Sequence, residues 1–166
     1  MKKKEHWISA LGLQSHPEGG YFKETYRSEL EFDPKDIGLK IKGKRSLSTG
    51  IYFLIESENF SAFHRIKSDE MWHYYGGDPL IVHMIDERGV YAKQLIGNNL
   101  DKGEQLQFVV PANVWFASEV KKGGDYSLVG CTVSFGFDFA DFELADIELI
   151  KKFPQHKRII ERLLKV

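Results

Sequence analysis

The stretch FHRIKSDEMWHYYGG, residues 63–77, predicts two β-strands joined by a short polar turn. Because side chains alternate along a strand, His64 shares a face with Ile66, and Glu70 shares a face with Trp72. If both faces point inward, an imidazole and a carboxylate converge on one space with aromatic walls. Such a pair can bind a divalent metal or act as acid and base.

Strand-like runs extend from this stretch in both directions, separated by turns rich in glycine, proline, asparagine and aspartate. We expect strands at residues 21–28, 48–55, 60–66, 71–75, 80–85, 91–96, 106–110, 114–117 and 126–135. Many short strands without a βαβ rhythm are typical of an all-β sandwich or barrel. The aromatic content of 13% agrees, because flat side chains suit sheet surfaces.

Short helices are expected at both ends of the chain. At the N-terminus, Trp7 and Leu11 share a helical face, and Gly12 is placed to end the helix. Near the C-terminus, Asp146 caps one helix and Pro154 fits the first turn of another. The apolar stripe of that last helix is predicted to pack on the barrel wall, with a dimer contact as the alternative.

Composition narrows the classes of function. The 166 residues fit a single domain, 1–166, and 23 basic against 24 acidic residues give a net charge of −1, which is not typical of nucleic-acid binding. The sequence lacks the apolar run of about 18 residues that a membrane-spanning helix needs. Cys131, the single cysteine, cannot form an internal disulfide, so we expect a cytoplasmic protein in which it is a buried structural thiol.

Two segments resemble the paired motifs of the cupin superfamily. In the first, His64, Glu70 and Gly77 match a histidine, the glutamate and the closing glycine. The second motif resembles residues 103–116. The chain departs from both patterns, because Ile66 replaces a histidine in the first motif and Phe116 replaces the histidine of the second.

Longer stretches at residues 16–28, 63–79 and 130–139 look like an uncharacterised cupin subfamily, described as a domain of unknown function. Its members are similar in fold to the dTDP-sugar epimerases and usually form dimers. The resemblance implies an all-β cupin fold, the double-stranded β-helix or jelly-roll barrel, with short N- and C-terminal helices. It also implies a homodimer, and it leaves the activity open.

A metal site remains an open hypothesis. Cupins that bind metal typically use three histidines and a glutamate, and only His64 and Glu70 match here. His73 and His83 are the available further ligands. Regular alternation puts His73 on the opposite face, so a β-bulge would have to turn it inward, and His83 lies in an apolar run that favours a core or surface histidine. The sequence establishes no cofactor, and a divalent metal is possible with His64, Glu70 and His73 as ligands.

The strand expected at residues 21–28 carries basic side chains. Regular alternation puts Lys23 and Arg27 on one face, which is either solvated or lines a pocket for an anion. Arginine binds phosphate and carboxylate through two hydrogen bonds, so Arg27 is the candidate anion ligand. A salt bridge across a dimer interface is the equal alternative.

Three functional hypotheses follow. The first is an isomerase- or epimerase-like enzyme for a small polar ligand, such as a sugar or nucleotide, in which His64 and Glu70 exchange protons and Tyr74 donates one. The second is a protein that binds or senses the ligand without chemistry, and the third is a metal-dependent enzyme; a purely structural dimer module with a filled barrel, which binds no ligand, is the alternative to all three. In each case His73 and three aromatic side chains, those of Trp72, Trp115 and Phe116, are candidates to contact the ligand, with core packing as the alternative for the aromatic side chains.

Overall fold

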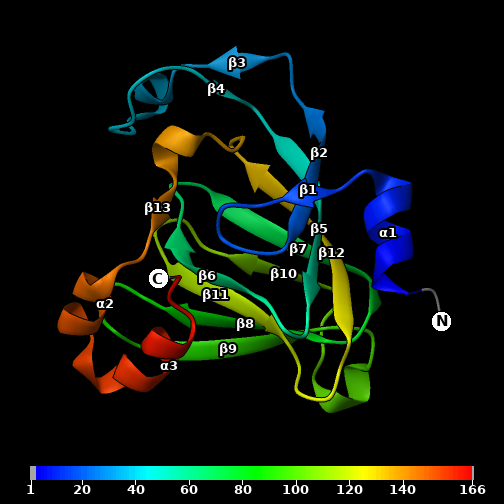
Figure 1. The fold of residues 1–166 in the computed structure, drawn as a ribbon. Helices are drawn as coiled ribbons and strands as arrows, with labels where there is room; N and C mark the ends of the chain where they lie inside the picture. Colours follow the sequence, from blue (N-terminus) through cyan, green and yellow to red (C-terminus); the bar gives the residue numbers. More distant parts are fainter. Residues whose placement is uncertain (1–2, 166) are drawn as a thin grey trace.

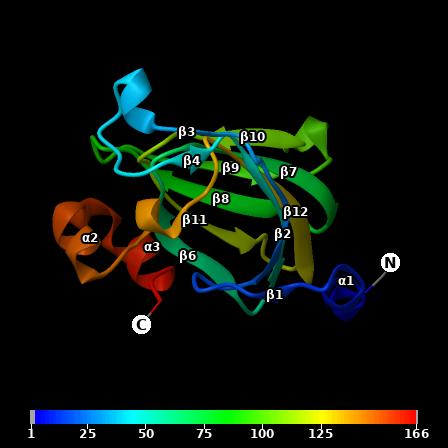
Figure 2. The same cartoon turned by 90° about the horizontal axis from the view of Figure 1, so that it is seen from above.

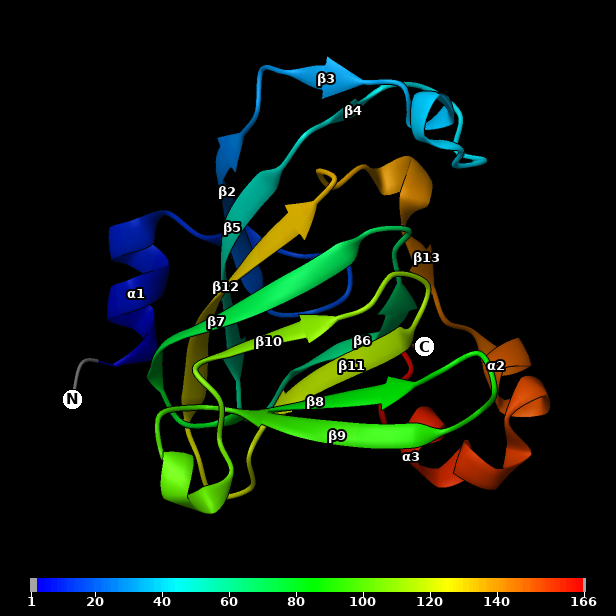
Figure 3. The same cartoon turned by 180° about the vertical axis from the view of Figure 1, so that it is seen from behind.

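The computed structural model describes residues 3–165, and most of its strands belong to two antiparallel sheets (Figures 1 and 3). In chain order the elements are α1 (Lys4–Leu11), β1 (Gln14–Ser15), β2 (Tyr21–Arg27), β3 (Glu31–Phe32), η1 (Pro34–Ile37), β4 (Arg45–Ser46), β5 (Thr49–Glu56), β6 (Phe60–Arg65), β7 (Asp69–Gly77), β8 (Leu80–Ile85), β9 (Tyr91–Ile96), η2 (Leu100–Lys102), β10 (Gln107–Val110), β11 (Trp115–Val120), β12 (Tyr126–Ser134), η3 (Phe139–Asp141), β13 (Glu143–Leu144), α2 (Ile147–Lys152), η4 (Pro154–His156) and α3 (Lys157–Arg162).

Neighbouring strands within each sheet are often distant in sequence. The larger sheet has the order β1-β2-β5-β12-β7-β10, and the smaller one has the order β13-β6-β11-β8-β9. β3 and β4 pair separately, in an arm at the top of Figure 1. Consecutive strands such as β5 and β6 therefore belong to different sheets, and the all-β jelly-roll prediction is confirmed.

The main core lies where the inner faces of the two sheets meet. Phe53 and Trp72 from the larger sheet pack in one buried cluster with Val82, Met84 and Phe116 from the smaller one. Val82 and Met84 occupy alternate positions along β8, as burial of one face of a sheet requires. The same alternation brings His64 and Glu70 to the inside of the barrel.

The terminal helices flank the barrel on opposite sides (Figure 2). α2 and α3 cover the outer face of the smaller sheet, where Ile160 and Leu163 pack against Phe63 and Trp115. The predicted packing of the apolar stripe on the barrel wall is therefore confirmed for Ile160 and Leu163. α1 lies beside the larger sheet and ends, as predicted, at Gly12, whose φ of 62° is left-handed.

Most predicted strands agree with the structure within a few residues, and those at 80–85 and 91–96 agree at both ends. Within residues 3–165, no helix has both the length and the apolar character needed to cross a membrane. Residues 1–2 and 166 of the predicted single domain, 1–166, lie outside the described range. The domain prediction and the cytoplasmic location stay predictions.

Ile160→Ala is expected to lower the free energy of unfolding by about 3 kcal/mol, because the side chain is fully buried between α3 and the sheet. The measurement is urea denaturation followed by tryptophan fluorescence. Ile147→Ala makes the same deletion at a side chain that is 57% exposed and should cost less than about 0.5 kcal/mol. Equal losses in the two variants would contradict the packing of α3 on the barrel.

Candidate functional site

A cavity of about 320 Å³ lies among β2, β5, β6, β7 and β12, which is the size range of small-molecule sites. Its apolar walls come from aliphatic and aromatic side chains, namely Phe22, Ile51, Ile66, Val133, Phe137 and Phe139. Its ionisable walls come from His16, Glu18, Glu24, Arg27, His64, Glu70, Cys131 and Asp138. A few polar groups that converge in an apolar space are typical of a binding or catalytic site.

Glu18 and His64 form a buried polar contact in the wall of the cavity. The Nε2 atom of His64 lies 3.1 Å from Oε2 of Glu18, and the two residues are 3% and 7% exposed. Nδ1 of His64 donates to the Ala62 carbonyl, 2.7 Å away, which fixes the position of the ring hydrogen. Burial raises the pKa of Glu18 and lowers that of His64, so the buried position favours the neutral form of each group.

Glu18 reaches this position because the chain at residues 18–20 lies directly against β6. The Glu18 carbonyl accepts a hydrogen bond from Ala62 N, and its carboxylate Oε1 accepts one from Ser61 Oγ at 2.8 Å. Gly19 has a φ of 115°, and a Cβ at this position would lie 2.0 Å from the Phe60 carbonyl oxygen. Only glycine permits this approach, which explains the pair Gly19-Gly20 next to a buried glutamate.

Glu70 is the second buried carboxyl group in the cavity. Burial raises its pKa to about 7, an effect that the nearby His64 opposes and the negative charge of Glu18 reinforces. The Cys131 thiol donates a hydrogen bond to this carboxylate, and burial raises the pKa of that thiol well above its ordinary value. Cys131 is therefore a buried, protonated partner of Glu70, in agreement with the expected structural thiol.

His16 lies beside Glu18 on the same segment. Its Nδ1 atom accepts a hydrogen bond from the Glu18 backbone N–H at 3.3 Å, and its ring packs edge-on against Phe22. Burial lowers the pKa of His16, while the neighbouring Glu18 opposes this effect. The two histidines of the cavity, His16 and His64, are thus held in their neutral forms.

Arg27 lines the cavity, but not through the regular alternation predicted for its strand. The pairing of β2 with β5 shifts between Glu24 and Tyr26, which leaves Thr25 as a β-bulge. After the bulge, Arg27 lies on the same face as Glu24, and Lys23 lies on the other face, exposed and outside the cavity. The prediction that Lys23 and Arg27 share a face is therefore wrong.

The Arg27 guanidinium is already paired within its own chain. Nε donates to Oε1 of Glu24 at 2.9 Å, and one terminal nitrogen donates to Oε2 at 2.7 Å and to the Phe137 carbonyl at 3.1 Å. This bidentate contact is a salt bridge of the kind that competed with the anion site in the sequence interpretation. Here it lies inside one subunit, between residues three apart.

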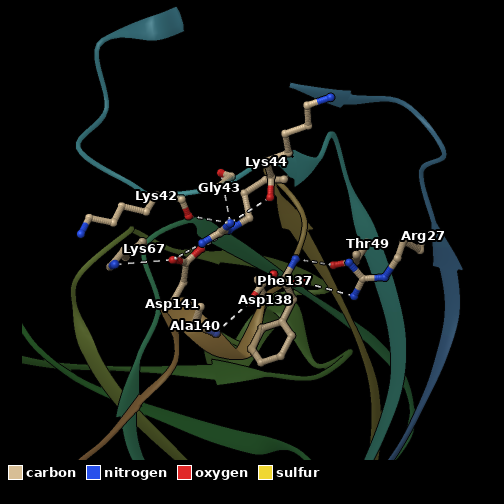
Figure 4. A network of polar contacts seen from close by, with 11 residues as sticks. Arg27, Lys42, Gly43, Lys44, Thr49, Lys67, Phe137, Asp138, Ala140 and Asp141 are labelled. Atoms are coloured by element: carbon tan, nitrogen blue, oxygen red, sulfur yellow. Dashed lines mark hydrogen bonds and ion pairs between the residues drawn. The ribbon is translucent and has the colours of Figure 1, made fainter. Parts of the chain in front are cut away.

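Residues 137–139 line the cavity, and Asp141, two residues further on, forms a buried ion pair with Arg45 (Figure 4). The Arg45 guanidinium donates to both oxygens of Asp141, at 2.7 and 2.8 Å, and also to the carbonyl oxygens of residues 42–44. Lys67, from the turn between β6 and β7, lies 3.5 Å from the same carboxylate. The arm that carries β3 and β4 is therefore tied to the segment that supplies Phe137, Asp138 and Phe139.

Several predicted site residues do not line the cavity. His73 faces away from it, with Nε2 2.9 Å from Thr132 Oγ1 and Nδ1 3.1 Å from the Gln107 amide nitrogen. The bulge in β7 follows Tyr74, too late in the strand to turn His73 inward. Trp115 lies on the outer face of β11, where the Arg65 guanidinium stacks 4.6 Å from its ring centre.

The remaining aromatic candidates belong to the core. Trp72 and Phe116 are fully buried in the main cluster, and the Phe116 ring packs 4.1 Å from the His64 ring. Tyr74 packs at the edge of this cluster, and its hydroxyl donates to the Gly77 carbonyl at 2.5 Å. These three side chains therefore pack in or against the core, and Phe116 also contacts the His64 ring.

The donor set does not fit a metal ion. Ile66 and Phe116 put hydrocarbon at two of the expected ligand positions, and His64 Nε2 is directed at Glu18. Among residues 3–165, no group of three histidine, cysteine, aspartate or glutamate side chains is arranged to hold a metal. His73, the predicted third ligand, lies on the opposite face of its strand from Glu70. Of the predicted ligands, His64 and Glu70 therefore share the cavity, and His73 does not join them.

Sequence reasoning did not identify Glu18, His16 or the residues that follow β12. Glu18 had one usable signal, a charged residue directly before a Gly-Gly pair that lets two segments approach closely. Asp138 and Phe139 lie at the start of the short helix η3, whose position no strand period fixes. His64, Glu70 and Arg27 do line the cavity, and their roles stay predictions.

Comparison with known proteins gives consistent matches. A family model described as Cupin superfamily (DUF985) matches residues 5–145. A hypothetical protein from Leishmania major superposes with a TM-score of 0.91 at 38% identity, covering 99% of this chain and all of that one. Protein SO0799 from Shewanella oneidensis gives a TM-score of 0.89 at 39% identity, with 99% of each chain covered. The uncharacterized protein YML079W of Saccharomyces cerevisiae is 29% identical over 81% of this chain and 71% of its own length.

Glu70→Gln is expected to stabilise the protein at pH 8 and to have little effect near pH 4.5. The folded-state pKa of Glu70 is raised from 4.5 to about 7, so the wild-type protein loses stability as the pH rises through this interval. Glutamine does not ionise and escapes this loss, which is worth about 1–3 kcal/mol.

Urea denaturation at both pH values measures the difference. Glu87→Gln makes the same change at an exposed turn position and should leave the free energy of unfolding unchanged at both. A Glu70→Gln variant that is less stable than wild type at pH 8 would contradict the buried, proton-holding carboxyl group.

Proposed function

This chain belongs to the cupin superfamily, in the family DUF985, and on that basis we propose that it binds a small polar molecule in the cavity and isomerises or epimerises it by proton transfer. The observation that carries the proposal is the convergence of Glu18, His64 and Glu70 on one cavity of about 320 Å³. All three are buried, and burial shifts the pKa of each away from its ordinary value. Groups with this behaviour in a cavity are typical of acid–base catalysis.

Glu70 is the group that takes the proton from carbon. Its pKa of about 7 leaves a large fraction ionised at neutral pH, yet makes it a stronger base than an ordinary carboxylate. A C–H bond next to a carbonyl group is the natural target, because the negative charge then moves to the carbonyl oxygen.

The Glu18–His64 pair supplies a proton to that oxygen. Oε2 of Glu18 and Nε2 of His64 lie 3.1 Å apart, which is close enough to share one proton, and Nδ1–H of His64 is fixed on Ala62. Proton transfer from the pair gives an enol. Glu70 then returns its proton to the neighbouring carbon or to the other face of the same carbon, while a hydroxyl group of the enol gives a proton back to the pair and a carbonyl group forms again. No proton is gained or lost overall.

A second candidate is a binding protein that performs no chemistry. The observation that favours it is the completeness of the hydrogen bonds around Glu18, which already satisfy its two oxygens through Ser61 and His64. Such a protein would use the apolar walls and Glu70 to hold its ligand. The homodimer and the cytoplasmic location expected from the sequence stay predictions under either function.

Deuterium exchange distinguishes the two functions. Glucose, fructose, mannose and glucosamine are incubated with the protein in D₂O, and NMR follows deuterium uptake at carbon. An enzyme introduces deuterium into at least one sugar, and His64→Ala and Glu70→Gln each slow that uptake by about a hundredfold or more.

His73→Ala and Tyr74→Phe are the matched controls, because both residues lie outside the cavity, and uptake should remain at the wild-type rate. A sugar that binds but acquires no deuterium establishes the binding protein instead. Unchanged uptake in His64→Ala rejects the proposed acid–base pair.

A further inference from the structure

The charge of the cavity walls indicates which ligands can enter. Four carboxyl groups line it, those of Glu18, Glu24, Glu70 and Asp138. Arg27 is the single lysine or arginine among the lining residues of the described chain. The two lining histidines do not offset the carboxyl groups, because burial favours their neutral forms.

Arg27 offers little to an anion. Two of its N–H groups are committed to Glu24 and one to the Phe137 carbonyl, so its charge is matched by a carboxylate at 2.7 Å. A phosphate or carboxylate ligand would displace that contact and would then lie close to the other carboxyl groups of the wall. Both effects oppose the binding of an anion.

Glu70, unlike Arg27, lacks a partner of opposite charge among the described residues. Its carboxyl group is more than nine-tenths buried and is held by the Cys131 thiol, and no lysine or arginine among the described residues forms an ion pair with it. The neighbouring Glu18 is a second carboxyl group, which supplies no counter-charge and repels the Glu70 carboxylate whenever it is ionised. A positive charge brought in by a ligand would stabilise the ionised form of Glu70 directly.

Aromatic rings lie beside these carboxyl groups. Phe22, Phe137 and Phe139 all line the cavity, and the last two meet edge to face with ring centres 5.0 Å apart. Asp138, between them in sequence, lines the same wall. Ring faces attract cations through their quadrupole, most strongly where water is excluded, so they reinforce the preference of the carboxyl groups.

We infer that the ligand of this cavity carries an ammonium group, which is held between the carboxylates and the phenylalanine rings. This inference rests on the same site as the proposed function and narrows its ligand class to amines, such as an amino sugar. It replaces the anion expected at Arg27. Phosphorylated and carboxylated sugars are poor ligands on this basis.

Two sets of matched probes test the charge preference. The hexoses glucosamine, glucose and glucuronate, and the four-carbon compounds butylamine, butanol and butyrate, differ mainly in the charge of one group. Binding is measured at pH 7.5 and constant ionic strength by thermal shift and by NMR titration. The ammonium member of at least one set should bind about tenfold more tightly than its neutral partner, and the anionic member should bind least.

Variants that neutralise one carboxyl group of the cavity wall test whether these groups cause the preference for ammonium. Glu70→Gln and Asp138→Asn each should remove most of the tenfold advantage of the ammonium probe, and asparagine preserves the cap that Asp138 makes to Ala140 N. Asp101→Asn removes a charge in η2, outside the cavity, and should leave it intact. Tighter binding of the anionic members, or ammonium probes that never exceed their neutral partners, overturns the inference.

The binding measurements test the ligand class, and the deuterium-exchange assay tests catalysis, so either hypothesis can fail without the other. Neutral sugars that bind and exchange deuterium while amines do not would refute the ammonium ligand and leave proton transfer standing. Amines that bind without exchange would refute catalysis and leave the ligand class standing.

Discussion

The contact between Glu18 and His64 is the constraint on which the site depends. A carboxyl group that is 7% exposed loses its hydration, and here that loss is offset by Ser61 Oγ and by the imidazole at 3.1 Å. The partners are available only if residues 18–20 lie against β6, which requires a residue without Cβ at position 19. A backbone requirement of one glycine thus determines which acid faces the histidine.

This contact also makes the cavity unsuited to bind a metal, although its sequence motif resembles that of metal-binding cupins. A histidine whose Nε2 faces a carboxyl oxygen has its lone pair occupied, and Ile66 offers no donor beside it. What remains is a set of buried carboxyl groups whose pKa values are raised because ionisation is costly there. The same cost lowers the stability of the fold, a trade that functional sites commonly make.

The sequence predicted the fold well and the site in part, for reasons that differ from residue to residue. In β6 and β7 the period of two holds from His64 to Trp72, so the inward positions of His64 and Glu70 followed from counting. In β2 the same counting failed at Thr25, because a bulge depends on the pairing with β5 and leaves no mark in the local sequence. Glu18 and Asp138 lie in irregular segments, where position depends on contacts with distant strands. Trp115 shows a different failure, since an aromatic residue next to a motif position faces the helices and not the cavity.

Because of the bulge at Thr25, the number of residues in β2 determines which charged side chains face the cavity. One unpaired residue is what turns Arg27 inward to meet Glu24, while the strand before it keeps Phe22 in the same wall. Loss of a single residue here would restore regular alternation and exchange the inward and outward sides of everything beyond it. Two relatives with the same side chains but strands that differ by one residue would then enclose cavities of different charge. In comparing members of this family, a one-residue gap in this strand is as informative as a substitution in the cavity.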